Sequence, residues 1–264
     1  MIILRKNKFI KVEKEIDDIA EKMFKSGQSI TSIAKELKID RGCLSVRLKA
    51  RGLDIKQHCN KKSINSNYFD EIDSEEKAYW LGFLIADGYI SDDNKVELCL
   101  KDKDHIEKFK KSLNLGNKIS IKKVKQYTAY RISFKDNHIG ERLKNLGCIP
   151  RKTFKLSLPI LNDVFMRHFI RGYFDGDGCI CMQDSLNKTQ ISFTCGCENF
   201  LIQLCEYLNS KLNFSTDLYV RQSHTAYEIR LFNNINKKEL LNYLYKNSSI
   251  YLDRKYKLYT HMPS

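Results

Sequence analysis

Two apolar segments that each end in Asp-Gly constrain the fold of this 264-residue chain more than any other feature. The first reads WLGFLIADG at residues 80–88, and the second reads IRGYFDGDG at residues 170–178. Apolar side chains recur in both at helical spacing. Small residues lie four apart on one face of each predicted helix, Gly82 with Ala86 and Gly172 with Gly176. Because glycine destabilises a helix by roughly 1 kcal/mol, this spacing indicates that the two helices pack closely together.

The chain around each Asp-Gly predicts the same order of elements, as a duplication would leave it. In the first unit, strands are expected over 95–100, 118–122 and 130–134, with helices over 104–113 and 139–146. In the second, strands are expected over 179–183, 190–195, 217–221 and 227–232, with helices over 198–212 and 237–245. A basic run ends each unit, at 150–153 and at 252–255. The sequence therefore predicts an α+β fold of two pseudo-symmetric repeats.

Close packing of the two helices would bring Asp87 beside Asp177. A carboxylate at the C-terminal end of a helix opposes the helix dipole, and two such carboxylates repel each other. The pair is unfavourable unless cations occupy the gap, and hard oxygen ligands with a mainly water-filled shell suit Mg²⁺. Taken singly, an Asp-Gly more often marks a helix end with a glycine cap. The matched pair is what favours metal ligands.

Both segments resemble the paired signatures of the LAGLIDADG homing endonucleases, and the resemblance covers about residues 70 to 260. It implies αββαββα-type repeats that form a DNA-binding saddle, with metal held at Asp87, Gly88, Asp177 and Gly178. The metal, Mg²⁺ or Mn²⁺ or Ca²⁺ in its place, would activate water for site-specific cleavage of both DNA strands. One departure is Ile85, which stands where the family usually has an earlier acid, whereas the second segment keeps Asp175.

Further site residues follow from the same resemblance. The basic runs match the position of a family residue that organises water or stabilises charge, which nominates Lys152 and Lys255 as catalytic; the alternative is a generic contact of these lysines with phosphate. Alternate side chains of the strands would contact the major groove, at a parity that the sequence leaves open. The candidates are Lys122, Arg131, Ser133, Gln190, Ser192, Arg221, Glu228 and Arg230.

The residues before the repeats predict a compact helical unit. Ile16, Ile19, Ala20 and Met23 recur at helical spacing, a short helix follows Ser29, and a third spans 41–51 with Leu44, Val46 and Leu48 facing inward. This order is similar to a helix-turn-helix of the resolvase kind, although an ordinary three-helix cap is the alternative. The resemblance implies DNA contacts by four residues of the third helix, Arg41, Ser45, Arg47 and Lys49. The expected domains are 1–53 (helix-turn-helix), 54–69 (linker), 70–160 (first repeat) and 161–264 (second repeat).

The overall charge supports a polyanionic partner. Lys and Arg number 46 against 32 acids, a formal net charge of +14, although a merely solvated basic surface would look the same. No run approaches the roughly 18 apolar residues of a membrane span. The charged start and the nine scattered cysteines favour a cytoplasmic protein with reduced thiols.

These features together predict a monomeric, metal-dependent endonuclease that binds double-stranded DNA, either free-standing or encoded in a mobile intron. Two alternatives remain on the same fold: a transcription regulator that binds DNA without cutting, and an RNA maturase. Relatives of the first kind have generally lost the motif acids, whereas Asp87 and Asp177 are both present.

Overall fold

The computed structural model describes residues 2–26, 28–53, 63–124, 127–149, 156–181, 188–215, 218–223 and 226–262. The chain forms two compact units, Met1–Lys62 and Ser63–Ser264. Within the described residues, no helix is long and apolar enough to cross a membrane.

The described residues of the first unit form the helices α1 (Ile2–Lys25), α2 (Ile30–Glu36) and α3 (Arg41–Ala50). Ser29 and Asp40 cap the second and third helices, since their side-chain oxygens accept hydrogen bonds from the backbone N–H groups of Ser32 and Cys43. The turn between these helices contains Lys38 at a φ of 53°. A small core of Ala20, Phe24, Ile33, Ala34, Leu44 and Leu48 holds the helices together. The predicted helical unit is therefore present.

Two details of this unit differ from the prediction. Helix α1 begins at Ile2, well before the helical pattern recognised from residue 13. Val46 was expected in the core, yet 68% of it is exposed. Leu44 and Leu48 are four apart and occupy the buried face of α3, so a residue midway between them must point to the opposite side.

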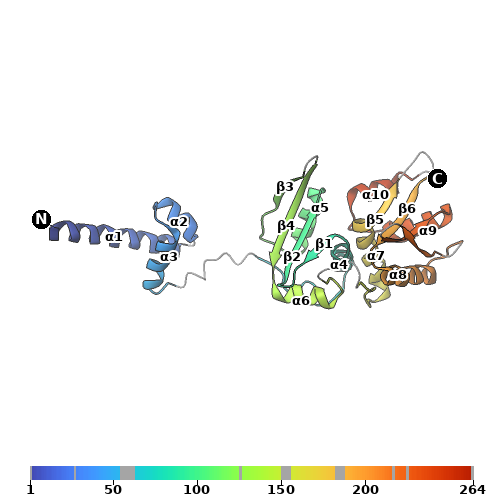
Figure 1. The fold of residues 1–264 in the computed structure, drawn as a ribbon, viewed down its shortest axis with the longest axis horizontal. Coiled ribbons are helices and arrows are strands. Elements are labelled where there is room, and N and C mark those ends of the chain that lie inside the picture. The colour runs from blue at the N-terminus through green and yellow to red at the C-terminus, as the bar shows by residue number, and fades with distance from the viewer. Residues whose placement is uncertain are drawn as a thin grey trace. The chain divides into compact units, whose positions relative to one another are not determined.

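The second unit contains the two predicted repeats (Figure 1). The first repeat consists of α4 (Glu75–Asp87), β1 (Gly88–Ile90), β2 (Lys95–Leu100), α5 (Lys103–Ser112), β3 (Ser120–Val124), β4 (Tyr127–Lys135) and α6 (Asn137–Asn145). The second consists of α7 (Asp163–Asp177), β5 (Gly178–Cys181), β6 (Gln190–Cys195), α8 (Glu198–Lys211), β7 (Val220–Ser223), β8 (Ala226–Leu231), α9 (Asn234–Tyr245) and α10 (Asp253–Thr260).

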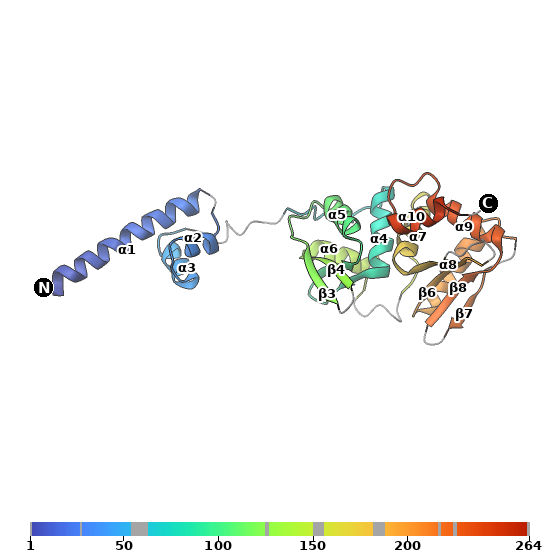
Figure 2. The same ribbon diagram turned by 90° about the horizontal axis from the view of Figure 1, so that it is seen from above.

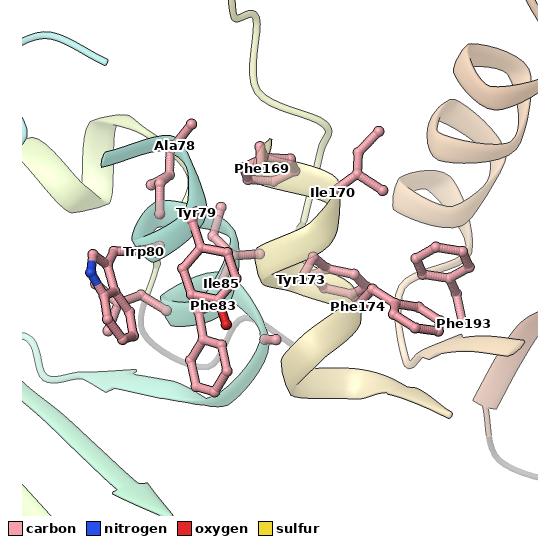
Figure 3. Packing of buried hydrophobic residues seen from close by; sticks show 14 of the residues in the cluster. Ala78, Tyr79, Trp80, Phe83, Ile85, Phe169, Ile170, Tyr173, Phe174 and Phe193 are labelled. Carbon is pink, nitrogen blue, oxygen red and sulfur yellow. The ribbon is translucent and has the colours of Figure 1, made fainter. Parts of the chain in front are cut away.

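Each repeat forms an antiparallel four-stranded sheet, in the order β1-β2-β4-β3 and β5-β6-β8-β7. The identical order confirms the predicted α+β fold of two pseudo-symmetric repeats. Helices α4 and α7 lie side by side between the two sheets in both views (Figure 1, Figure 2). Phe83 and Trp80 on α4 and Tyr173 and Phe174 on α7 are fully or almost fully buried in the shared core (Figure 3).

The contact between α4 and α7 is made backbone to backbone. A Cβ atom added to Gly82 would lie 2.0 Å from the carbonyl oxygen of Phe169, and one added to Gly172 would lie 2.0 Å from that of Tyr79. No side chain fits such a gap. The two glycines therefore fix how closely the helices approach, and this explains small residues at these helix positions.

Three local features were not predicted. Strand β1 is only three residues long, and α10 has no side-chain cap at its start, so neither carries a strong local signal. Residues 63–69 were assigned to the linker, but Tyr68 and Phe69 are buried in the core of the second unit. Two aromatic residues in succession can bury enough apolar surface to hold a segment that otherwise looks polar. The remainder of the predicted linker, 54–62, lies outside the described residues.

We expect Gly82→Ala and Gly172→Ala each to lower the free energy of unfolding by about 3 kcal/mol or more, because α4 and α7 must separate to admit the methyl group. Urea unfolding followed by circular dichroism measures this. Gly42→Ala is the control, since Gly42 is exposed in α3 and only the Asp40 side chain lies near its position. Unchanged stability of both α4 and α7 variants would contradict the backbone contact.

Candidate active site and nucleic-acid interface

Asp87 and Asp177 are exposed residues at the ends of two buried helices. In α4 every residue from Ala78 to Ala86 is buried, and in α7 the buried run reaches Asp175. Gly88 and Gly178 follow with φ of −74° and −77°, so neither is the left-handed glycine of a common helix cap. At both places the backbone instead passes directly from helix to strand, and the aspartate is the last helical residue before the sheet.

The structure brings the end of α4 against the end of α7. A Cβ atom added to Gly176 would lie 2.4 Å from the Cβ of Ala86 and 3.4 Å from Oδ2 of Asp87. The Asp87 carboxylate therefore lies beside the residue that precedes Asp177. The ends of α4 and α7, where Asp87 and Asp177 lie, are therefore in contact.

The donor set around these acids fits an ion that is shared with a substrate. In the part of the chain that the structure describes, no three or more His, Cys, Asp or Glu side chains gather into a metal cage. Mg²⁺ is usually held by one or two carboxylates, its remaining positions being filled by water and substrate phosphate. Two exposed carboxylates at one surface match that pattern, whereas a closed structural site such as zinc would require more protein ligands.

A pocket of about 830 Å³ lies beside Asp87 and is lined by both repeats. Its cations are Lys101, Lys122 and Arg254, of which only Lys122 was predicted. Lys101 lies 4.1 Å from the ring centroid of Tyr127, and Arg254 Nε lies 3.3 Å from Asp102 Oδ2. The register Gly88↔Leu98 places the end of β2 next to Asp87, so recognition of the short strand β1 would have pointed to Lys101.

Lys255 lies beneath the helix end rather than at the surface. It is 2% exposed, and its Nζ donates hydrogen bonds of 2.5 Å to the carbonyl oxygens of Phe174 and Gly178. Burial lowers the pKa of Lys255 to about 8, although the carboxylates of Asp175 and Asp87 favour its charged form. The lysine caps the C-terminus of α7, where a cation stabilises the helix dipole. Lys152, the other nominated lysine, lies outside the described residues.

Asp175 is the centre of a buried polar network that joins the repeats. Its carboxylate accepts hydrogen bonds from the Tyr79 hydroxyl (2.7 Å), the Tyr245 hydroxyl (2.6 Å) and the backbone N–H of Leu252 (2.7 Å). Burial raises the pKa of Asp175, while Tyr245, Lys255, Leu252 and Tyr79 oppose that rise. Asp175 is therefore a structural acid, and in the first repeat Ile85 fills the corresponding position with an apolar side chain.

The network extends to His105, whose Nε2 lies 3.0 Å from the Tyr79 hydroxyl oxygen. The hydroxyl proton goes to Asp175, so Nε2 of His105 must carry the hydrogen of this contact. Its Nδ1 has no hydrogen-bond partner among the described residues. Burial lowers the pKa of His105 to about 3, which keeps the ring neutral at ordinary pH.

The two sheets show which strand residues face away from the core. Ile132 and Phe134 on β4 and Ile229 and Leu231 on β8 are buried in the core. Their alternate neighbours point to the opposite face, which we call the outer face. The strand registers place all eight predicted strand residues on it: Lys122, Arg131, Ser133, Gln190, Ser192, Arg221, Glu228 and Arg230. Both outer faces also contain acids, since Arg131 pairs with Glu97 at 3.6 Å and Arg221 pairs with Glu228 at 2.5 Å.

The four predicted contact residues of α3 do not share one environment. Arg41 and Lys49 are exposed and Ser45 is partly so, and their spacing of four puts them on one helical face. Arg47 is turned toward α1, where its Nε lies 2.8 Å from Oδ1 of Asp17. Arg51 likewise pairs with Asp18 and Glu21 of α1. Of the four predicted contact residues, Arg41, Ser45 and Lys49 therefore share one face of α3, and Arg47 does not.

Comparisons with known proteins identify the fold of both repeats. Residues 164–245 match the model of the LAGLIDADG-like domain, and residues 76–150 match that of the WhiA LAGLIDADG-like domain. An uncharacterized protein of Methanocaldococcus jannaschii is 26% identical over 191 residues, which are 69% of this chain and 68% of that protein.

The solved structures that are similar to this chain include two proteins of different kinds. The homing endonuclease I-WcaI, bound to its DNA recognition sequence, aligns with a TM-score of 0.53 and 16% identity over 73% of this chain and 90% of its own. Full-length WhiA from Thermotoga maritima aligns with a TM-score of 0.47 and 13% identity over 68% of this chain and 59% of its own.

We expect Lys255→Met to lower the free energy of unfolding by about 2 kcal/mol or more, because two backbone oxygens lose their donor and Asp175 loses a nearby cation. Thermal unfolding measures the change, with Lys257→Met as control, since Lys257 is an exposed residue of the same helix. Equal stability of the two variants would show that Lys255 is not a buried cap.

Buried neutral His105 predicts acid sensitivity. Its folded pKa of about 3 lies below the ordinary 6.5, so the stability it contributes is present above pH 6.5 and is lost as pH falls toward 3. Between pH 7 and pH 5 this loss is about 2 kcal/mol. His105→Gln should reduce the difference in unfolding free energy between the two pH values by about that amount, as urea titrations would measure. An unaltered difference would mean that His105 titrates normally.

Proposed function

Because the second unit has the two-repeat LAGLIDADG fold, we propose that this protein is a site-specific, metal-dependent endonuclease of double-stranded DNA. The observation that supports this most is the pair of exposed acids, Asp87 and Asp177, held at the ends of two helices whose spacing is fixed by Gly82 and Gly172. A helix pair that serves only as a core has no need of two carboxylates at the same surface.

In this proposal, Asp87 and Asp177, with the backbone oxygen of Gly88, would hold Mg²⁺ or a similar divalent ion, which would supply a Lewis acid for hydrolysis of the phosphodiester bond. The carbonyl oxygen of Gly178, also expected as a ligand, is instead taken by the Lys255 ammonium. Lys101 and Arg254 in the pocket bind the phosphates that flank the cut, which lengthens the contact beyond the acids. Lys255 would not contact DNA in this proposal; its Nζ orients the backbone at Gly178 through a hydrogen bond to the carbonyl oxygen. Lys152 remains the nominated counterpart in the first repeat.

The outer faces of both sheets and the exposed face of α3 supply DNA binding. The lysines and arginines there favour a polyanion, in keeping with the +14 charge of the chain. A helix-turn-helix attached to the repeats would raise affinity through linked binding, and it would place a monomer on a longer, asymmetric site. With DNA as substrate, the protein would act in the cytoplasm as an enzyme of intron homing.

Duplexes selected by binding from a randomised library, incubated with Mg²⁺ or with EDTA, test the proposal. We expect EDTA-sensitive double-strand cleavage. Asp87→Asn and Asp177→Asn should each reduce it at least about a hundredfold, since each removes a metal ligand worth several kcal/mol. Asp92→Asn is the control, because Asp92 is an exposed acid of the same repeat away from the helix ends. Gel electrophoresis separates nicked from fully cut products.

A second function is supported by the match of residues 76–150 to the WhiA LAGLIDADG-like domain. In that case the fold binds DNA without cutting it, and the acids serve no chemistry. Specific binding with no cleavage in Mg²⁺, Mn²⁺ or Ca²⁺ would establish this alternative and reject the endonuclease.

A further inference from the structure

The outer face of the second sheet contains a charge triad, defined here as Arg221, Glu228 and Arg230. Arg221 Nη2 lies 2.5 Å from Glu228 Oε1, and Arg230 Nη2 lies 3.2 Å from Glu228 Oε2. Each arginine thus uses a different oxygen of the same carboxylate. The strand register accounts for this geometry, because Arg221 on β7 lies directly opposite Glu228 on β8, and Arg230 lies two residues further along β8 on the same face.

The triad is ordered before any partner arrives. The Glu228 residue is 5% exposed, so its carboxylate serves the arginines instead of the solvent. The Arg221 guanidinium also lies 5.3 Å from the ring centroid of Phe232, an exposed aromatic on the same face. The Nε atoms of Arg221 and Arg230 are buried and have no hydrogen-bond partner among the described residues, so they are not the donors offered to a ligand. The two arginine side chains as a whole are 32% and 33% exposed, and this exposed part is held in place where a partner can reach it.

The first repeat has a different charge pattern at the corresponding positions. The registers Leu98↔Ile132 and Phe193↔Ile229 align the two sheets, so Arg131 corresponds to Glu228. By the same registers, Ser120 corresponds to Arg221, and Ser133 corresponds to Arg230. The first repeat therefore has one arginine between two serines, where the second repeat has one glutamate between two arginines. Two halves of a palindromic site would not need such different surfaces.

The carboxylate also distinguishes between two kinds of contact. A cluster that binds phosphate gains from every positive charge and loses from a neighbouring acid, because the acid repels the phosphate. A cluster that binds the uncharged edge of a base gains when its donors are held in a fixed orientation, and a neighbouring carboxylate can hold them so. Guanine presents two acceptors, N7 and O6, in the major groove, and arginine is the side chain that most often binds them.

We propose that Arg221 and Arg230 each bind one guanine in the half-site contacted by the second repeat, and that Glu228 is a positioning residue which orients both. This inference rests on the proposed DNA binding and does not depend on cleavage. It predicts an asymmetric target with two guanines in that half-site and a different base pattern in the other.

The whole chain is used to select duplexes from a randomised library in EDTA, where binding alone is measured. We expect two guanines in one half of the selected site. Arg221→Lys and Arg230→Lys should each remove the preference for one of them, with affinity for the selected duplex reduced roughly ten- to a hundredfold and affinity for random duplex unchanged. Glu228→Gln should weaken both preferences together. Arg131→Lys, the matched control in the first repeat, should leave both guanines preferred.

A base substitution separates groove contact from other effects. Replacing either guanine of the selected duplex by 7-deazaguanine removes N7 and should weaken binding at least fivefold, whereas inosine keeps both major-groove acceptors and should bind normally. The proposal is overturned if no guanine is selected, if 7-deazaguanine binds normally, or if Glu228→Gln leaves both preferences intact. If instead the proposed endonuclease function is wrong, the protein would bind DNA selectively but would not cleave it with any metal.

Discussion

The approach of α4 to α7 is the interaction on which the rest of the second unit depends. Each helix presents a glycine to a backbone carbonyl of the other, at a separation that excludes even a methyl group. This contact sets the distance between the two sheets and the distance between Asp87 and the last turn of α7. Because the acids are the last residues of these helices, packing in the core determines the geometry at the surface. The site is therefore only as rigid as the helix pair beneath it.

The two repeats share this frame but stabilise it by different means. In α7, Arg171 is fully buried and donates to Glu75 of α4 at 2.6 Å and to the carbonyl oxygens of Leu244 and Ile250. In α4 the corresponding position is Leu81, which is apolar. Buried charges are tolerated only where every partner is in place, so the second repeat is held in one arrangement. Duplication preserved the topology, while the chemistry of the interior diverged.

Much of the fold could be predicted from the sequence, whereas the placement of several charged side chains could not, for physical reasons. Strands 95–100 and 190–195 agree residue for residue with β2 and β6, because alternation and flanking turns are local signals. The placement of Lys255 was not predictable, since a lysine in a basic run looks the same whether its Nζ reaches a phosphate or a helix end. The ion pair of Arg47 with Asp17 was likewise not predictable, because Asp17 lies 30 residues earlier in the chain. Tertiary pairing of charges leaves no local pattern.

The same limit applies to Glu228, and it shows how acids function on a basic surface. From sequence alone, Glu228 was grouped with the arginines as a direct DNA contact. The structure shows its carboxylate taken up by Arg221 and Arg230, so its effect on a ligand must pass through them. The Glu228 carboxylate is almost fully buried, and it restricts the two flexible arginine side chains to one geometry. Because the arginines are already ordered before binding, the proposed guanine contacts would gain selectivity between bases more than affinity.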